Sequence, residues 1–103
     1  MTGEKTMIVV RFKVKCKPEK TEQAVALFKG IVTASQPLDG VVSFDMGRDI
    51  TDPDSFIALE VFDDRAALDR QESLAVVKKT MGLFEELLAA EPEATIFHVS
   101  STE

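Results

Sequence analysis

The sequence contains no tryptophan, tyrosine or asparagine, and it has a single cysteine, Cys16, and a single histidine, His98. A lone cysteine excludes an intrachain disulfide, and a lone histidine excludes a histidine-rich metal site. A nucleotide-binding glycine loop, a nucleophile motif and a catalytic triad are also missing. The sequence therefore predicts neither a metal site nor a cofactor.

Positive charge is also scarce, since 12 Lys and Arg residues face 18 Asp and Glu residues and give a net charge of −6. Nucleic acid and anionic membranes require a clustered basic surface, so neither is an expected partner. One local basic cluster, Arg11 to Lys17, alternates along a predicted strand and is expected on a solvated or interface-rim face. No apolar run could cross a bilayer, and the first residues lack a secretory-signal layout. A cytoplasmic protein is the default expectation.

A chain of 103 residues suits one domain with a modest core. Residues 1–6 are polar and are expected to form a flexible tail. Periodicity and turn residues predict strands at 7–16, 41–49, 56–62 and 94–100, and helices at 18–35 and 65–90. This order, β-α-β-β-α-β, predicts an α+β fold of the ferredoxin-like kind, an antiparallel sheet with both helices on one face.

Several details refine this expectation. Pro18 is placed at the first helical position, and Pro92 is placed after the end of the second helix, which falters near residues 71–74. Residues 50–54 are expected to connect the second and third strands as a hairpin. In the second strand, Val42 is assigned to the face of Phe44, Met46 and Arg48, and Val41 to the opposite face with Asp45.

Several strands are apolar on both faces, whereas helices on one side cover only one face. A second copy of the same sheet is the simplest cover for the other face. The sequence therefore predicts a homodimer that forms through the sheet face.

One charged residue interrupts an apolar strand: Glu60, between Leu59 and Val61. A carboxylate on an inner strand costs several kcal/mol unless it is paired, hydrogen-bonded or protonated. Glu60 therefore has a partner or lines a cavity. Asp63 and Asp64 follow as candidate N-caps for the second helix.

The stretch Leu59-Glu60-Val61-Phe62-Asp63-Asp64, followed by Ala67-Leu68, resembles the antibiotic biosynthesis monooxygenase domain family. Gly40 before the second strand and Asp52-Pro53 before Phe56 extend the likeness. The resemblance implies a dimeric α+β barrel, which quinol monooxygenases share. It also implies cofactor-free oxygenation, in which a small aromatic substrate such as a quinol supplies electrons to oxygen.

The candidate catalytic residues are Glu60 and His98, either of which could take a proton from the substrate. The candidate substrate-binding residues are Phe12, Phe44, Phe62 and Arg48. Each candidate also has a structural alternative. Glu60 could be a buried carboxylate that is paired with Arg11 or Arg48 or hydrogen-bonded to backbone N–H groups, and His98 could be a structural histidine of the strand or of a dimer interface. Arg48 could form a salt bridge at the surface, and the phenylalanines could belong to the core.

The chain departs from the family pattern early in the second helix. Many members carry a histidine there and often a second soon after, at positions that correspond to Arg70 or Gln71 and to Ala75 or Val76. At the aromatic position that follows the strand glutamate, the family usually has tryptophan, whereas this chain has Phe62. Two hypotheses follow: a cofactor-independent oxygenase, or a non-catalytic dimeric barrel that binds a small apolar ligand as a stress-associated or accessory protein.

Overall fold

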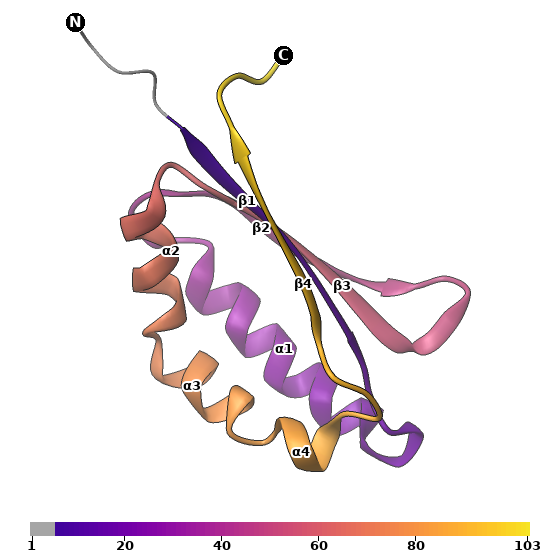
Figure 1. Ribbon diagram of the computed structural model, residues 1–103. Helices are drawn as coiled ribbons and strands as arrows, with labels where there is room; N and C mark the ends of the chain where they lie inside the picture. Colours follow the sequence, from indigo (N-terminus) through magenta and orange to yellow (C-terminus); the bar gives the residue numbers. More distant parts are fainter. Residues whose placement is uncertain (1–5) are drawn as a thin grey trace, which may run out of the picture.

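Residues 6–103 are described by a computed structural model, so all but Thr6 of the tail expected at residues 1–6 lies outside the described residues. The elements are β1 (Met7–Lys15), the 3-10 helix η1 (Pro18–Lys20), α1 (Thr21–Ser35), β2 (Val41–Asp49), β3 (Asp52–Phe62), α2 (Arg65–Glu72), α3 (Ala75–Met81), α4 (Phe84–Leu87) and β4 (Glu93–Val99) (Figure 1).

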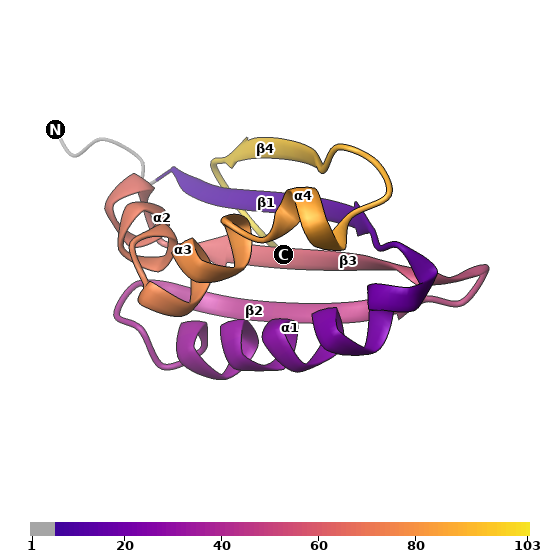
Figure 2. The same cartoon turned by 90° about the horizontal axis from the view of Figure 1, so that it is seen from below.

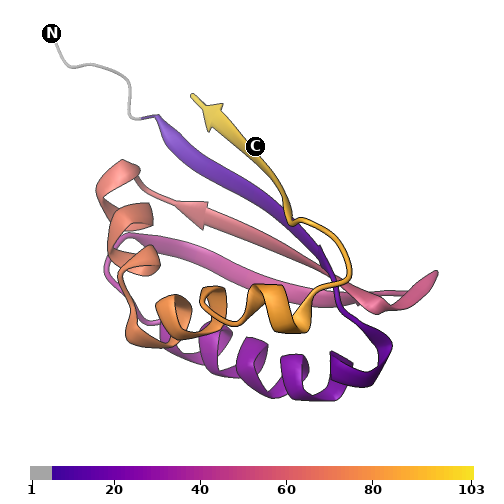
Figure 3. The same cartoon turned by 60° about the horizontal axis from the view of Figure 1, so that its bottom comes forward.

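The strands form a 4-stranded sheet in the order β2-β3-β1-β4. Every neighbouring pair is antiparallel. The α-helices lie on one face of this sheet, and α1 runs alongside the segmented stretch from α2 to α4 (Figures 2 and 3). The ferredoxin-like α+β prediction is therefore confirmed.

The β2–β3 hairpin is tighter than predicted. Asp49 pairs with Asp52, so β3 begins at Asp52 and the turn contains only Ile50 and Thr51. The Asp49 carboxylate stabilises this turn by accepting hydrogen bonds from the Thr51 backbone N–H at 2.8 Å and from Thr51 Oγ1 at 2.7 Å. The expected connection at residues 50–54 is thus wrong for its second half, which belongs to the strand.

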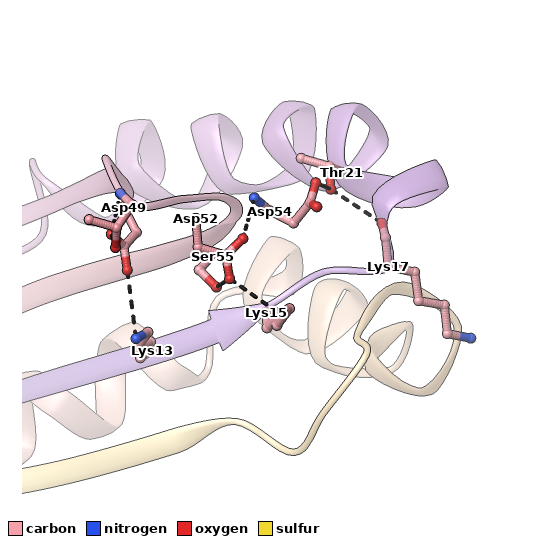
Figure 4. Close-up of polar contacts among 9 residues, drawn as sticks. Lys13, Lys15, Lys17, Thr21, Asp49, Asp52, Asp54 and Ser55 are labelled. Carbon is pink, nitrogen blue, oxygen red and sulfur yellow. Dashed lines mark hydrogen bonds and ion pairs between the residues drawn. The ribbon is translucent and has the colours of Figure 1, made fainter.

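Ion pairs and a hydrogen bond fasten the end of this hairpin to the rest of the chain (Figure 4). Lys13 Nζ lies 3.7 Å from Asp49 Oδ2, and Lys15 Nζ lies 3.2 Å from Asp52 Oδ2. Thr21 Oγ1 donates to Asp54 Oδ1 at 2.7 Å, which joins the start of α1 to β3. These basic side chains of β1 therefore pair with hairpin carboxylates at the rim of the sheet.

The expected helix at 65–90 is three helices, and it ends earlier than Pro92. Asp64 caps α2, since its Oδ1 accepts a hydrogen bond from Ala67 N at 2.9 Å. After α4, Lys17 N donates to Leu87 O and Ala89 N donates to Lys15 O, each at 2.8 Å. These bonds to the end of β1 replace helical ones, so the helix stops at Leu87. Pro18 opens the 3-10 helix η1, and α1 begins only at Thr21.

A bulge in β2 changes which side chain reaches the core. The register shifts between Val41 and Ser43, so that Val41 pairs with Phe62 and Phe44 pairs with Glu60. Val41 therefore packs against the core, while Val42 is 54% exposed. The assignment of Val42 to the face of Phe44 is wrong because a bulge resets the two-residue alternation of a strand.

The core lies between α1 and the helix-facing side of the sheet. Buried residues of α1 recur at helical spacing: Thr21, Ala24, Phe28, Ile31 and Ser35. Phe28 meets Phe56 of β3 edge-on, with ring centroids 5.3 Å apart. Gln71 Nε2 donates to Ser35 Oγ at 3.1 Å inside the protein, which ties α2 to the end of α1.

Gly40, in the turn before β2, meets two requirements that only glycine satisfies. Its φ is +84°, and an added Cβ would lie 2.6 Å from Ala67 Cβ. The turn therefore needs both the left-handed conformation and the close approach of α2.

No helix of residues 6–103 covers the second face of the sheet (Figure 1). This face presents apolar side chains to solvent, with Leu59 49% and Phe97 48% exposed. Arg11 lies on the same face, because it pairs with Leu59 in the β1–β3 register. No helix within residues 6–103 has the length and apolarity needed to span a membrane.

Candidate functional site

A cavity of about 150 Å³ lies between the helix-facing side of the sheet and the helices. Its walls are mostly apolar and come from all four strands and from helices α1 to α4. The lining residues are Val10, Phe12, Phe28, Ile31, Phe44, Met46, Glu60, Leu68, Gln71, Glu72, Val77, Met81, Phe84, Ala94 and Ile96. A mostly apolar cavity with a few polar groups is the usual form of a small-molecule site.

Glu60 is the buried carboxylate of this cavity. It lies on β3, directly opposite Val10 of β1 and Phe44 of β2, and it is 8% exposed. Within residues 6–103 its side chain has no hydrogen bond or ion pair. Burial and, to a smaller extent, the negative charge of Glu72 raise the pKa of Glu60 from 4.5 to about 7.

The arginines that could have satisfied Glu60 lie elsewhere. Arg11 projects from the uncovered face of the sheet, as its pairing with Leu59 requires. Arg48 Nη2 lies 3.0 Å from Glu22 Oε2, and the Arg48 guanidinium sits 4.9 Å from the ring centre of Phe56. Glu60 is therefore a cavity carboxylate that meets no countercharge in the part of the chain that the structure describes.

The predicted aromatic residues separate into two groups. Phe12 and Phe44 line the cavity, and the Phe12 ring stacks on Phe84 with centroids 6.3 Å apart. Phe62 is fully buried at the far end of β3, beside Ile8 and Val41 in the register, and it does not line the cavity.

Arg48 lies in a different place from the cavity carboxylate. It lines a second, more open groove of about 370 Å³ between α1 and β2. Phe28 and Met46 line both spaces and so stand between them.

His98 is exposed on β4 and does not line the cavity. It pairs with Ile8, and Ile8 pairs with Phe62, so His98 is on the same sheet face as Glu60. However, β1 separates the two residues, and they are offset by two positions along the strands. Standard strand spacing puts their Cα atoms roughly 12 Å apart. The structure does not bring Glu60 and His98 together in one site.

Sequence reasoning missed two polar residues of the cavity wall, Gln71 and Glu72 at the end of α2. Of the two alternatives for the family's first histidine, Gln71 lines the cavity and Arg70 is exposed. Neither Ala75 nor Val76, the alternatives for the second histidine, lines the cavity. The signal in the sequence was the interrupted periodicity after Gln71, where α2 ends and the chain turns into α3.

The residues that the structure describes contain no cluster of three or more His, Cys, Asp or Glu side chains that could hold a metal ion. Cys16 is completely buried, and burial raises the pKa of its thiol. The residues that line the cavity offer a ligand apolar contact, aromatic stacking and proton exchange with Glu60.

The fold and the cavity define a ferredoxin-like α+β protein with a mostly apolar cavity between its sheet and its helices. Residues 7–83 match the antibiotic biosynthesis monooxygenase family, a segment that includes Glu60 and ends before His98. The chain belongs to this family.

The chain is also similar to proteins of other organisms. An uncharacterised protein of Synechocystis sp. is 31% identical over 98% of this chain and 69% of its own length. The Bacillus subtilis protein named "Putative monooxygenase YcnE" is 29% identical over 82% of this chain and 88% of its own length. A solved structure of a conserved Methanosarcina mazei protein superposes with a TM-score of 0.83 at 24% identity, covering 93% of this chain and 95% of that one, and it supports the fold alone.

Proposed function

We propose that the protein is a cofactor-independent monooxygenase that acts on a small, electron-rich aromatic molecule such as a quinol. The observation that carries the proposal is Glu60, a buried carboxylate that has no countercharge among residues 6–103 and lies in a cavity lined by phenylalanine. Membership of a monooxygenase family supports the reaction class.

Glu60 serves as the general base. A carboxylate of ordinary pKa is a poor acceptor for a phenolic proton, whose pKa is about 10. Burial, together with the negative charge of Glu72, brings the pKa of Glu60 to about 7, which narrows this gap while a useful fraction remains ionised near neutral pH. Removal of the proton concentrates electron density on the ring, and the ring then reacts with dioxygen.

The proposed reaction balances without another reductant. One oxygen atom replaces a ring hydrogen of the quinol, and the other leaves as water. The quinol supplies all the electrons and is released as a hydroxyquinone. The proton that Glu60 accepts leaves with the water.

Oxygen uptake by the purified protein, with a panel of quinols and polyphenols and with no added cofactor or metal, tests this proposal. Uptake faster than autoxidation, with isotopic oxygen from dioxygen appearing in the product, is the expected result. A folded protein that never exceeds autoxidation across the panel would contradict it.

A second candidate is a protein that binds a small apolar ligand without converting it. The exposed position of His98 favours this candidate, because the cavity then lacks the second proton-transfer group expected from the sequence. Saturable binding of an aromatic compound without oxygen consumption would select the binding role.

We further propose that the uncovered sheet face pairs with a second copy of the chain. Leu59 and Phe97 expose about half of their surface there, and Val9, Ile57 and Val61 of the same face are partly exposed. Burial of such a face in a symmetric interface removes apolar area from water at about 25 cal/mol per Å².

A further inference from the structure

The cavity wall has charge of one sign. Glu60 from β3 and Glu72 from α2 are its charged residues, and no Lys, Arg or His among residues 6–103 lines it. Gln71 is the remaining polar residue, and its Nε2 already donates to Ser35 Oγ at 3.1 Å. A ligand that carries a negative group would therefore meet no positively charged side chain among the described residues that line the cavity.

The carboxylates occupy different depths. Glu60 is buried, whereas Glu72 is exposed to solvent and also lines the cavity, which places it at the mouth. Their influence on each other is visible in the pKa of Glu60, which the charge of Glu72 raises. An anionic substituent on a ligand would meet the same repulsion from Glu72 on entry and would lose its hydration inside the apolar walls.

The volume also restricts the ligand. An apolar cavity of about 150 Å³ is large enough for one benzene ring. The interior walls are large side chains, including Phe12, Phe44 and Met46, that leave little room for fused rings without repacking.

We propose that this cavity selects single-ring aromatic ligands without negative charge, and that Glu72 at its mouth is the specificity residue that rejects their anionic analogues. The inference rests on the proposed function for the nature of the ligand, but it concerns binding and not turnover. Glu72 acts here through repulsion of the wrong ligand, which is a common source of discrimination between similar molecules.

Anaerobic binding measurements test the inference independently of the reaction. The probes are hydroquinone, its carboxylated analogue gentisate, and the three-ring compound anthrahydroquinone. Because the chain has no tryptophan or tyrosine, the fluorescence anisotropy of each ligand can be read with almost no protein background. We expect hydroquinone to bind at least about tenfold more tightly than either analogue.

Glu72→Gln isolates the role of the mouth carboxylate. The variant should narrow the ratio of hydroquinone to gentisate affinity about threefold or more, while the ratio of hydroquinone to anthrahydroquinone stays the same. Glu19→Gln, at an exposed carboxylate of η1 that does not line the cavity, is the matched control and should change neither ratio. Circular dichroism on heating verifies that both variants fold.

The outcomes separate the two proposals. Selective hydroquinone binding without oxygen uptake would leave this inference standing and remove the proposed monooxygenase function. Three results would each overturn the inference. They are gentisate binding as tight as hydroquinone binding, a ratio of hydroquinone to gentisate affinity that Glu72→Gln leaves unaltered, and preferred binding of the three-ring compound. Absence of binding for all three compounds would overturn the inference alone, since oxygen uptake across the wider panel tests the proposed function separately.

Discussion

Glu60 and His98 lie on the same face of the sheet but on opposite sides of β1, and only Glu60 lines the cavity. Since β1 keeps their side chains too far apart to share a proton, proton removal is assigned to Glu60. We expect His98→Ala to keep the quinol-dependent oxygen uptake within about threefold of the original protein. A loss of about 100-fold would mean that His98 reaches the substrate in an assembly or conformation different from this one.

The rate should also depend on pH through Glu60. Its pKa of about 7 belongs to a group that acts as a base when ionised, so kcat/KM after subtraction of autoxidation should rise as the pH passes about 7. Glu72 is the charged group that faces Glu60 from α2; the other lining residues, of all four strands and of α1 to α4, are uncharged. Glu72→Gln should therefore move this rise to lower pH. A pH profile that is identical in both proteins would contradict the electrostatic coupling.

The free energy of unfolding should also depend on pH through Glu60, but it should decrease as the pH rises. The folded state holds the Glu60 proton up to about pH 7, whereas the unfolded state releases it near 4.5. The unfolded state thus binds fewer protons in this window, so the free energy of unfolding falls as the pH rises through it and the penalty persists above it. The full contribution is about 3 kcal/mol.

Denaturant unfolding at about pH 5 and about pH 8 measures this penalty. The difference between the original protein and Glu60→Gln isolates Glu60 from other titrating groups. We expect the variant to gain stability relative to the original protein as the pH increases. An equal pH dependence in the two proteins would show that Glu60 has an ordinary pKa in the folded state.

The turn before β2 gives a prediction for stability alone. Gly40→Ala introduces a side chain at φ +84° and within 2.6 Å of Ala67 Cβ, and should lower the free energy of unfolding by about 1–3 kcal/mol. Gly47→Ala is the control, because an added Cβ there would meet nothing within 4 Å. Thermal unfolding of both variants should show a lower Tm for Gly40→Ala only; similar values would mean that the turn can relax.

The uncovered sheet face gives a prediction for assembly. Leu59→Glu places a charge in its apolar patch and should convert a dimer into a monomer, as measured by sedimentation equilibrium. Ile50→Glu is the matched control, since Ile50 is 100% exposed but lies at the tip of the β2–β3 hairpin. A monomeric original protein, or equal dissociation of both variants, would rule out the proposed interface.

Much of the fold could be predicted from local patterns. Two-residue alternation separated Arg48 from Asp45 on β2, and the acidic pair after β3 indicated the N-cap that Asp64 forms. These features depend on neighbours in the sequence. Their physical causes, strand pleating and helix capping, act over a few residues.

The remaining features depend on contacts between distant segments. The bulge at Val41 and Ser43 follows from pairing with β3, and the end of α4 follows from backbone bonds to the end of β1. The break between α2 and α3 falls directly after Glu72, which lines the cavity. The exposed position of His98 follows similarly from the edge position of β4, which no single strand pattern reveals.

The central claim is that Glu60 removes the proton that starts oxidation of the substrate. The most direct test compares quinol-dependent oxygen uptake by the original protein and by Glu60→Gln, with ligand binding measured anaerobically on the same samples. We expect the variant to bind the quinol but to lose about 100-fold or more of the rate above autoxidation. A variant that binds the quinol and consumes oxygen at the original rate would contradict the claim.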